Sequence, residues 1–184
     1  MKQSSLSDLA EKGYLDRAIQ GDTKAYGVLY THYLEEIHRY IYYRVINQAE
    51  AEDLTETVFI KAWDALPRFE SSKVNLRAWL YRIAHNTVID FYRTKRSTVE
   101  LSSQQHDRQP SLEHQIQTLE DNRGLALAIQ TLDEKLQQVV LCRFVNGLSH
   151  AETAEIMGLK EGHVRVLQLR ALQKLRLVLE KQYE

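Results

Sequence analysis

Residues 147–176, GLSHAETAEIMGLKEGHVRVLQLRALQKLR, carry the clearest structural signal in this sequence. Ser149 can cap a short helix that runs to about Met157, because a serine hydroxyl accepts hydrogen bonds from the free amides of a first helical turn. Gly158 can adopt the left-handed backbone that ends such a helix, and a second helix begins near Lys160. A short helix, a tight turn and a longer helix in this order predict a helix-turn-helix motif.

The second helix of this motif has one apolar face and one face suited to DNA. The apolar stripe comprises Val164, Leu167, Ala171, Leu175 and Val178. The opposite side presents Gly162, Arg165, Val166, Leu169 and Gln173, with His163 and Arg170 on the flanks. In a major groove, Arg165 can grip the two acceptors of guanine, and Val166 and Leu169 can touch thymine methyl groups. Candidates for phosphate contacts are Arg143, Arg170, Lys174 and Arg176. The alternative is a surface helix of a bundle with ordinary solvated cations.

The composition describes a helical globular protein without a global excess of positive charge. The 184 residues are 43% hydrophobic and 27% charged, and 24 Lys and Arg against 25 Asp and Glu give a net charge of −1. Any nucleic-acid surface must therefore come from local segregation of charge. The single cysteine, Cys142, suits a reducing cytosol, and we find neither a signal peptide nor a membrane-spanning stretch. We expect a soluble intracellular protein of the all-α class.

No cofactor, metal or catalytic site is expected. The seven histidines show no ligand spacing with cysteine or paired carboxylates. No glycine-rich phosphate loop and no nucleophile paired with a base can be recognised. Cys142 lies in a helix rich in Val, Leu and Phe, which favours a small core residue over a redox sensor.

The rest of the chain is predicted to form four further helices and a linker, followed by the helices that lead into the motif. Ser7 can cap the first helix, which runs to about Gln20, and Asp22 can cap the second. The third helix runs from near Asn47 to just before Pro67, and Asn75 can cap the fourth. After the linker, Asp133 caps a helix that Gly147 ends. After Arg96 the apolar periodicity stops in a polar stretch, STVELSSQQHDRQPS. We therefore predict two small helical domains, residues 1–96 and 116–184, joined by a flexible linker over residues 97–115.

The fourth helix, NLRAWLYRIAHNTVIDFYRTKR at residues 75–96, combines rings and cations. Helical spacing places Leu76, Trp79, Leu80, Ile83 and Thr87 toward the core and Arg77, Tyr81, His85 and Tyr92 outward. Further cations near this helix are Lys73, Arg82, Arg93, Lys95 and Arg96. Single-stranded nucleic acid requires such a surface, because rings stack with bases while cations neutralise phosphates. The alternative is tyrosines half-buried against a neighbour, with a basic tail that complements the end of the helix.

The helix before it, AEDLTETVFIKAWDAL, is amphipathic and has acidic residues in its first half. Those acids either stabilise the helix dipole or belong to a surface that docks another protein. Together with the fourth helix, the polar spacer and the region from Leu132 to Arg176, this stretch resembles the extracytoplasmic-function (ECF) group of the sigma-70 family. The resemblance covers nearly everything from about Asp16 onward.

The resemblance implies a dissociable specificity subunit of bacterial RNA polymerase, cytoplasmic and not an enzyme. Its partners would be core RNA polymerase and promoter DNA, and an anti-sigma factor is common in the family. The implied polymerase-binding residues are Asp53, Leu54, Thr57, Ile60 and Trp63. The region that melts and reads the −10 element would include Arg77, Trp79, Tyr81, Arg82 and Asn86, to which helical spacing and charge add His85, Tyr92, Arg93, Lys95 and Arg96.

The resemblance also assigns two further elements. The loop from Phe69 to Val74 corresponds to the segment that captures a flipped base. The implied −35 reader comprises Arg143, His163, Arg165, Val166, Leu169 and Arg170, with Lys174 as a phosphate contact. The family often has Ser or Thr with Arg or Lys early in this helix, where the present chain has His163, Val166 and Leu167. We therefore expect a −35 preference of its own.

Two other functions compete with this hypothesis. The chain could be a stand-alone helix-turn-helix regulator whose first domain dimerises or binds an effector. It could also be a helical adaptor whose basic faces bind RNA or an acidic protein.

Overall fold

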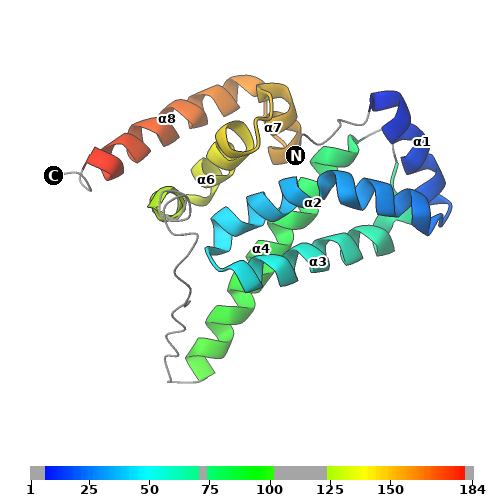
Figure 1. Cartoon of the computed structure of the whole chain (residues 1–184). Helices are drawn as coiled ribbons and strands as arrows, with labels where there is room; N and C mark the ends of the chain where they lie inside the picture. The colour runs from blue at the N-terminus through cyan, green and yellow to red at the C-terminus, as the bar shows by residue number, and fades with distance from the viewer. Residues whose placement is uncertain (1–6, 71–73, 102–123, 181–184) are drawn as a thin grey trace, which may run out of the picture.

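The structure is a computed structural model that describes residues 7–70, 74–101 and 124–180. Within these residues every regular element is a helix and none is a strand, which confirms the all-α prediction. Figure 1 shows the helices of the first part of the chain beside a second group that ends in α8. No helix in the described ranges is both long and apolar enough to cross a membrane.

The first domain contains α1 (Asp8–Ile19), α2 (Thr23–Val45), α3 (Gln48–Ala65), the short 3-10 helix η1 (Leu66–Arg68) and α4 (Leu76–Leu101). The caps predicted at Ser7, Asp22 and Asn75 are confirmed, since their side-chain oxygens accept hydrogen bonds from first-turn amides, and Asn47 caps α3 in the same way. These polar residues fix where each helix starts, so the predicted helix order is observed.

The second domain contains a helical stretch at 124–130, α6 (Glu134–Val140), the π-helical turn η2 (Leu141–Val145), α7 (His150–Met157) and α8 (Glu161–Glu180). Gly147 and Gly158 both have a positive φ, as predicted for glycine stops. Asp133 precedes α6, but its side chain makes no capping bond. Asp133 therefore occupies the predicted N-cap position, but its carboxylate accepts a hydrogen bond from Lys174 Nζ of α8 at 2.6 Å in place of one from a first-turn amide.

The core of the first domain is rich in rings. Ile37, Tyr40, Ile41, Val58 and Val88 are fully buried. Tyr30 meets Phe59 edge-on at 4.7 Å between ring centroids, a geometry that aromatic pairs favour. The second domain has its own buried apolar set, which includes Ile129, Leu141, Cys142, Leu148 and Val164. The core position predicted for Cys142 is confirmed, and burial raises the pKa of its thiol to about 12.

Helix α4 is longer than predicted. It continues to Leu101, five residues past Arg96, because the segment from Ser97 has no Gly or Pro to stop a helix. Residues 102–123, which include most of the predicted linker, lie outside the described part.

The two domains touch directly. Helix α4 packs against α7, and α2 packs against η2. Because α4 already packs on α2 and α3 within its own domain, it has neighbours on two sides. This arrangement decides which of its side chains reach solvent.

Candidate nucleic-acid interface

The outward face of α8 is open to solvent. Val164, Leu167, Ala171 and Leu175 are buried, as predicted, and Val178 is partly buried. On the other side, His163, Arg165, Val166, Leu169, Arg170 and Lys174 are all exposed. Two of these are apolar, with Leu169 60% and Val166 46% exposed. An exposed apolar residue between cations suits a surface that contacts both base methyl groups and phosphates.

Arg165 is the best-placed base reader on this face. Its guanidinium is 63% exposed and pairs only at the surface with Glu161, at 3.2 Å between Nη2 and Oε2. Such an exposed pair contributes at most about 1 kcal/mol, so guanine can replace it at little cost. The position of Arg165 in the first turns of α8 matches the part of a recognition helix that enters a major groove.

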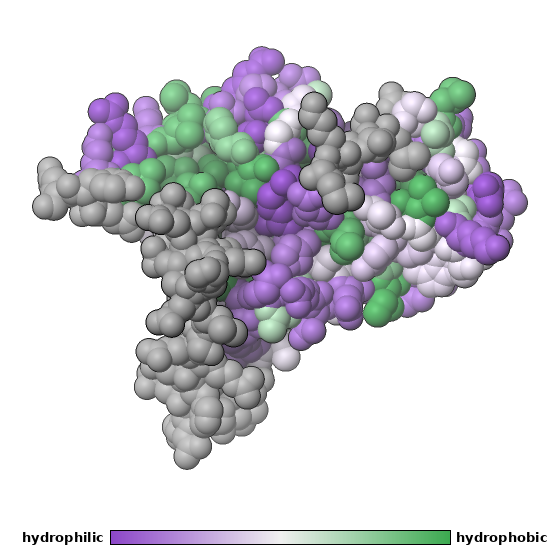
Figure 2. Space-filling model, viewed as in Figure 1, coloured by the Kyte–Doolittle hydropathy of each residue, from purple (hydrophilic) through white to green (hydrophobic). Residues whose placement is uncertain are grey.

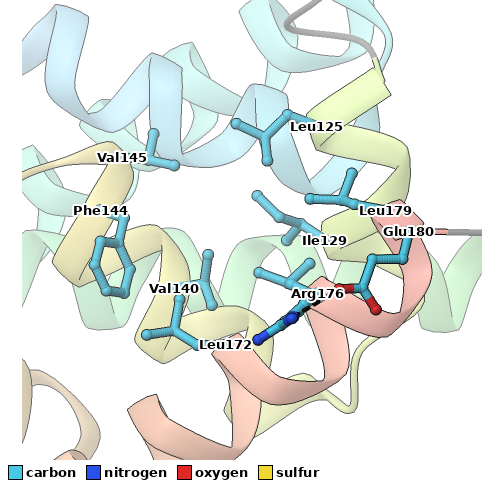
Figure 3. Close-up of a pocket in the computed structure, with 10 residues that line it drawn as sticks. Leu125, Ile129, Val140, Phe144, Val145, Leu172, Arg176, Leu179 and Glu180 are labelled. Carbon is cyan, nitrogen blue, oxygen red and sulfur yellow. Dashed lines mark hydrogen bonds and ion pairs between the residues drawn. The ribbon is translucent and has the colours of Figure 1, made fainter. Parts of the chain in front are cut away.

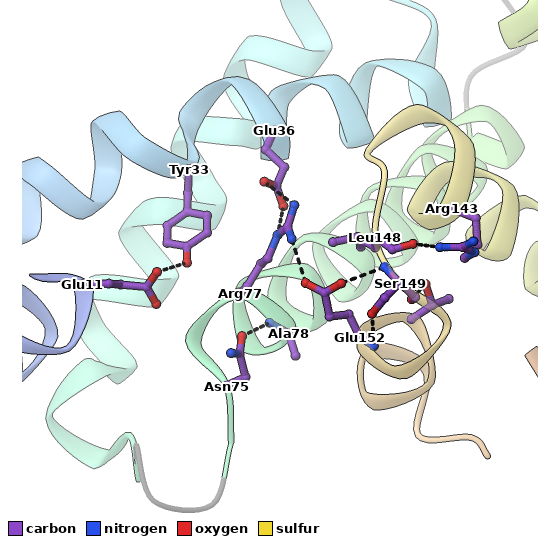
Figure 4. Close-up of polar contacts among 11 residues, drawn as sticks. Glu11, Tyr33, Glu36, Asn75, Arg77, Ala78, Arg143, Leu148, Ser149 and Glu152 are labelled. Carbon is purple, nitrogen blue, oxygen red and sulfur yellow. Dashed lines mark hydrogen bonds and ion pairs between the residues drawn. The ribbon is translucent and has the colours of Figure 1, made fainter. Parts of the chain in front are cut away.

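A capping box fixes the turn that presents α8. Ser149 Oγ accepts a hydrogen bond from the Glu152 amide at 3.1 Å, and Glu152 Oε2 accepts one from the Ser149 amide at 2.7 Å (Figure 4). At the other end of α7, Gly158 adopts the left-handed conformation with φ 64°. Both ends of α7 are therefore specified locally.

Arg143 serves the structure of the second domain. Its Nε donates to Gln168 Oε1 at 3.1 Å, and its Nη1 donates to the Leu148 carbonyl (Figure 4). The side chain therefore connects η2 both to α8 and to the loop that precedes α7. Its predicted contact with DNA stays a prediction, but the guanidinium is already engaged.

The outward orientation predicted for Tyr81 is wrong. Its side chain is 0% exposed and meets the ring of Tyr40 edge-on at 5.1 Å. Burial, with a smaller contribution from the Glu36 carboxylate, raises the pKa of its phenol. Helical spacing assumed one packed face for α4, whereas α2 packs beside Tyr81 and α3 and α7 pack on α4 as well.

His85 and Tyr92 are also half-buried rather than free. His85 is within reach of the Tyr40 hydroxyl at 3.3 Å and of Glu134 Oε1 at 3.5 Å. Tyr92 donates its hydroxyl proton to the Arg44 carbonyl at 2.6 Å. The alternative of tyrosines packed against a neighbour therefore describes Tyr81 and Tyr92 correctly.

Two arginines predicted to bind DNA contact carboxylates and carbonyls in the structure, and their contact with DNA stays a prediction. Arg77 bonds to Glu36 of α2 and to Glu152 of α7. Arg82 donates to the carbonyls of Glu155 and Ile156 at the end of α7. Trp79 packs on Phe69 at 4.8 Å between ring centroids, as its predicted core orientation requires.

The later turns of α4 do face solvent. Asn86, Arg93 and Lys95 are exposed, and Lys95 pairs with Glu50 at 2.8 Å while lying 5.1 Å from the Phe91 ring centroid. Arg96 lies in α4, but its side chain belongs to the residues that the structure does not describe. The loop predicted to capture a base is described only in part, since residues 71–73 lie outside the described ranges.

Helix α3 presents part of the predicted polymerase-binding set. Asp53 is exposed, Thr57 is half-buried and Ile60 is 62% exposed. These three are spaced so that they share one side of the helix. Leu54 is buried and Trp63 packs against Tyr26 at 4.9 Å, so both support the helix from inside.

An apolar groove in the second domain was missed by sequence reasoning. It has a volume of about 790 Å³ and is lined by Leu125, Ile129, Val140, Phe144, Leu172 and Leu179, among others (Figure 3). Figure 2 shows apolar residues gathered over the α6 and α8 end of the molecule. The exposed Phe144 in a run of Val and Leu was the available signal, but the groove exists only after α6, η2 and α8 assemble.

Glu36 and Glu152 were also missed as partners of Arg77. Glu152 is recognisable as the acidic member of a capping box, but nothing local indicates a contact 75 positions away along the chain. Among the residues that the structure describes, no group of three His, Cys, Asp or Glu is arranged to hold a metal ion.

The geometry defines a helix-turn-helix DNA-binding protein with a second, ring-rich helical domain. Comparison with known families matches "Sigma-70 region 2" over residues 29–98 and "Sigma-70, region 4" over residues 128–177. The RNA polymerase sigma factor SigZ of Bacillus subtilis is 31% identical over 153 residues, which cover 83% of this chain and 85% of SigZ. The chain therefore belongs to the sigma-70 family, and its relatives place it in the ECF group.

Two further likenesses agree with this assignment. The ECF RNA polymerase sigma factor BldN of Streptomyces coelicolor is 36% identical over 165 residues, covering 88% of this chain but only 62% of BldN. The solved structure of CnrH in complex with the cytosolic domain of CnrY superposes with a TM-score of 0.73 at 25% identity, covering 94% of this chain and 98% of CnrH.

Proposed function

We propose that this chain directs core RNA polymerase to a distinct set of promoters by reading the −35 element with α8 and the −10 element with α4. The exposed first half of α8 carries this proposal most directly, because it offers a guanidinium, two apolar side chains and flanking cations to one groove. We assign −10 recognition to residues 1–96, linkage to 97–115 and −35 recognition to 116–184.

The energy of strand opening supports a role as a subunit rather than as an independent melting protein. Unstacking a base-pair step costs about 1.4 kcal/mol on average, and an aromatic platform returns roughly 1–3 kcal/mol per stacked base. One small domain that holds one or two bases cannot sustain a bubble of many base pairs. A large partner must supply the rest, and the exposed Ile60 beside Asp53 and Thr57 on α3 is our candidate docking surface for it.

We infer the partners from the same reasoning. They are core RNA polymerase, promoter DNA and a regulatory protein of the anti-sigma type. The last follows from the likeness to CnrH, which has been solved with the cytosolic domain of CnrY. We place the chain in the bacterial cytoplasm and assign it no catalytic activity of its own.

Run-off transcription with purified core polymerase on fragmented genomic DNA tests the proposal. Adding the chain should produce a defined set of new transcripts, and Ile60→Glu should abolish them by placing a charge in the docking surface. Leu9→Glu is the matched control, because Leu9 is another exposed leucine-sized residue, 87% exposed on α1. Tight binding to a palindromic operator without an effect on polymerase would support the stand-alone regulator instead, and preference for structured RNA would support the adaptor.

A further inference from the structure

The charge of Arg143 is held in place without being neutralised. Its Nε donates to Gln168 Oε1 at 3.1 Å, and its Nη1 donates to the Leu148 carbonyl (Figure 4). Both acceptors are neutral, and no ion pair joins this guanidinium to a carboxylate among the described residues. Arg77 and Arg176, by contrast, pair with glutamates. An anion from outside the protein can therefore still neutralise Arg143.

The third nitrogen of this guanidinium is open to a ligand. Within the described part of the chain, Nη2 of Arg143 makes no hydrogen bond and does not belong to the buried unpaired nitrogens. A guanidinium presents its five N–H donors in a rigid planar fork. The bonds of Nε and Nη1 therefore also fix the direction in which Nη2 points, so that this edge of Arg143 is oriented before any ligand binds.

Gln168 holds Arg143 through a single oxygen. Oε1 of Gln168 accepts from Arg143 Nε and lies 3.0 Å from His150 Nε2. An arginine has donors only, so the amide atom that faces it must be the oxygen rather than the nitrogen. Because an amide oxygen only accepts, His150 Nε2 must carry a proton and donate to it as well. Two donors thus occupy the two lone pairs of this oxygen and fix the Gln168 amide.

This group of side chains lies beside the part of α8 that carries Arg165. Gln168 is three positions after Arg165, and residues at that spacing are neighbours on a helix surface. His150 is the first residue of α7, and the first helix of a helix-turn-helix crosses the DNA backbone while the second enters the major groove. When the first turns of α8 enter a groove, the Gln168 side of the helix faces the groove wall, where the phosphates lie.

The backbone that carries Arg143 is a second sign of a functional position. Arg143 belongs to η2, a π-helical turn that continues α6. The Asn146 amide donates to the Leu141 carbonyl at 3.0 Å and closes this five-residue step. Such turns are rare and occur frequently at functional sites.

We propose that Gln168 is a positioning residue for DNA binding, whose oxygen, fixed by His150, holds Arg143 so that Nη2 donates to a phosphate beside the groove that Arg165 enters. A charge-assisted bond from a guanidinium to phosphate is stronger than one from a neutral amide. Arg143 therefore makes the contact, and Gln168 acts through it. The contact carries no base information, because phosphate contacts position a protein on DNA without reading sequence. This inference rests on the proposed function, since it assigns a role within −35 binding.

The salt dependence of promoter binding separates a charged contact from a neutral one. On duplex DNA, loss of one phosphate contact made by a cation makes the slope of log affinity against log salt shallower by about 0.9. Gln168 is uncharged, so a slope that changes when Gln168 is replaced must change through a cation. The probe is a labelled duplex that carries one promoter from the run-off set, titrated with reconstituted holoenzyme between about 50 and 200 mM salt.

Four single variants and one double variant make the test. Gln168→Met removes the acceptor of Arg143 and keeps the length of the side chain, Arg143→Met removes the cation, and the double variant measures their coupling. Gln20→Met is the matched control, because Gln20 is exposed at the end of α1 in the other domain. His150→Ala removes one of the two donors that fix Gln168. Urea denaturation checks that each variant folds.

Gln168→Met and Arg143→Met should each weaken promoter binding about tenfold, the effect of one lost hydrogen bond to a charged group. Each should make the slope shallower by about 0.9, and the double variant should bind no worse than Arg143→Met. The factor should be the same on duplexes with altered −35 bases. His150→Ala should make the slope shallower by a smaller amount, and Gln20→Met should match the wild type.

Weaker binding by Gln168→Met at an unchanged slope would overturn the positioning role, because the amide would then contact DNA itself. Additive losses in the double variant, or a Gln168→Met variant identical to Gln20→Met, would overturn it too. If Gln168→Met does not fold, an unchanged slope for His150→Ala overturns the role. A wild-type holoenzyme that binds the promoter no better than an unrelated duplex refutes the proposed function instead.

Discussion

Helices α4 and α8 carry the two surfaces predicted to bind DNA, and these surfaces differ in how far they are exposed to solvent. The reading face of α8 has no helix packed over it, and Arg165, Val166 and Leu169 are exposed. On α4, Tyr81 is fully buried against Tyr40 of α2, and Arg77 bonds to Glu36 of α2 and to Glu152 of α7. The same kind of sequence pattern thus produced one open and one closed surface.

The difference shows what an amphipathic pattern means. Periodicity separates the side of a helix that its own domain covers from the side that remains. It does not say whether a second domain will cover that remaining side. Nor does it show that α4 packs on more than one side within its own domain, since Tyr81, predicted to face outward, is buried against Tyr40 of α2.

The largest test of the comparison is a matched pair of truncations. Tyr81→Ala should lower the free energy of unfolding by about 3–5 kcal/mol, because it removes a fully buried ring and leaves a cavity beside Tyr40. Leu169→Ala on α8 should change it by at most about 0.5 kcal/mol, because its side chain is already in water. Urea denaturation measures both, and equal effects would contradict the contrast drawn between the helices.

A second pair compares two exposed arginines. Arg165→Ala should relax sequence choice at one upstream position by about 1–3 kcal/mol, the value of a bidentate contact to guanine. Arg93→Ala on α4, 79% exposed beside Asp90, should weaken all promoters alike and reduce the slope of log affinity against log salt by about 0.7–0.9.

Promoter binding by the reconstituted holoenzyme, measured on a library of upstream sequences at several salt concentrations, distinguishes the two arginines. Identical profiles for both variants on every sequence would count against the assigned roles. Arg17→Ala, at an exposed ion pair with Asp22 on α1, is the control.

A smaller effect is expected at the capping box of α7. Ser149→Ala should cost the second domain about 1 kcal/mol, since the hydroxyl that accepts the Glu152 amide is lost. Ser7→Ala should cost less, because its bond to the Ala10 amide is long at 3.4 Å and stands at the start of the described chain. Hydrogen exchange at the amides of residues 152 and 10 compares the two helix starts directly. Equal loss of protection in the two variants would show that the capping box stabilises α7 no more than the single bond of Ser7 stabilises α1.

The smallest expected effect is a pH dependence at the domain contact. The pKa of His85 is lowered by burial and then by the charge of Arg44, while Glu134 opposes the shift. The folded state therefore binds this proton less tightly than the unfolded state. Its contribution to stability is fully present above the unfolded pKa of about 6.5 and is lost as the pH falls below that value.

Unfolding free energies measured between about pH 7.5 and pH 5.5 on either side of that value should fall more steeply for the wild type than for His85→Gln. His163→Gln, at an exposed histidine on α8, is the comparison. If the stability of His85→Gln falls with pH as steeply as that of the wild type, His85 does not cause the pH dependence.

Much of the fold was predictable because its signals are local. A cap such as Asn75, a stop such as Gly158 and an apolar stripe such as Val164 to Leu175 act within a few residues, and each was found where expected. Asp133 is an exception, because its carboxylate accepts a hydrogen bond from Lys174, 41 positions later in the sequence, and none from the first turn of α6.

The part of the site that does not contact the other domain was predictable from the sequence, and the part that does was not. The exposed face of α8 follows from its own helix and the turn before it, so helical spacing sufficed. Arg77 and Arg82 of α4 have partners 41 to 75 positions away, and no local pattern encodes such pairs.

The sequence by itself determined an all-α chain of the sigma-70 type, the ends of most helices and the DNA-facing side of α8, since hydrogen bonds of caps and the period of a helix are short-range. The tertiary structure alone decided that Arg77, Tyr81 and Arg82 are covered, that Glu36 and Glu152 share one guanidinium, and that an apolar groove opens beside α8. The reason is that burial depends on everything that packs around a side chain, and its neighbours across the domain contact are distant in sequence.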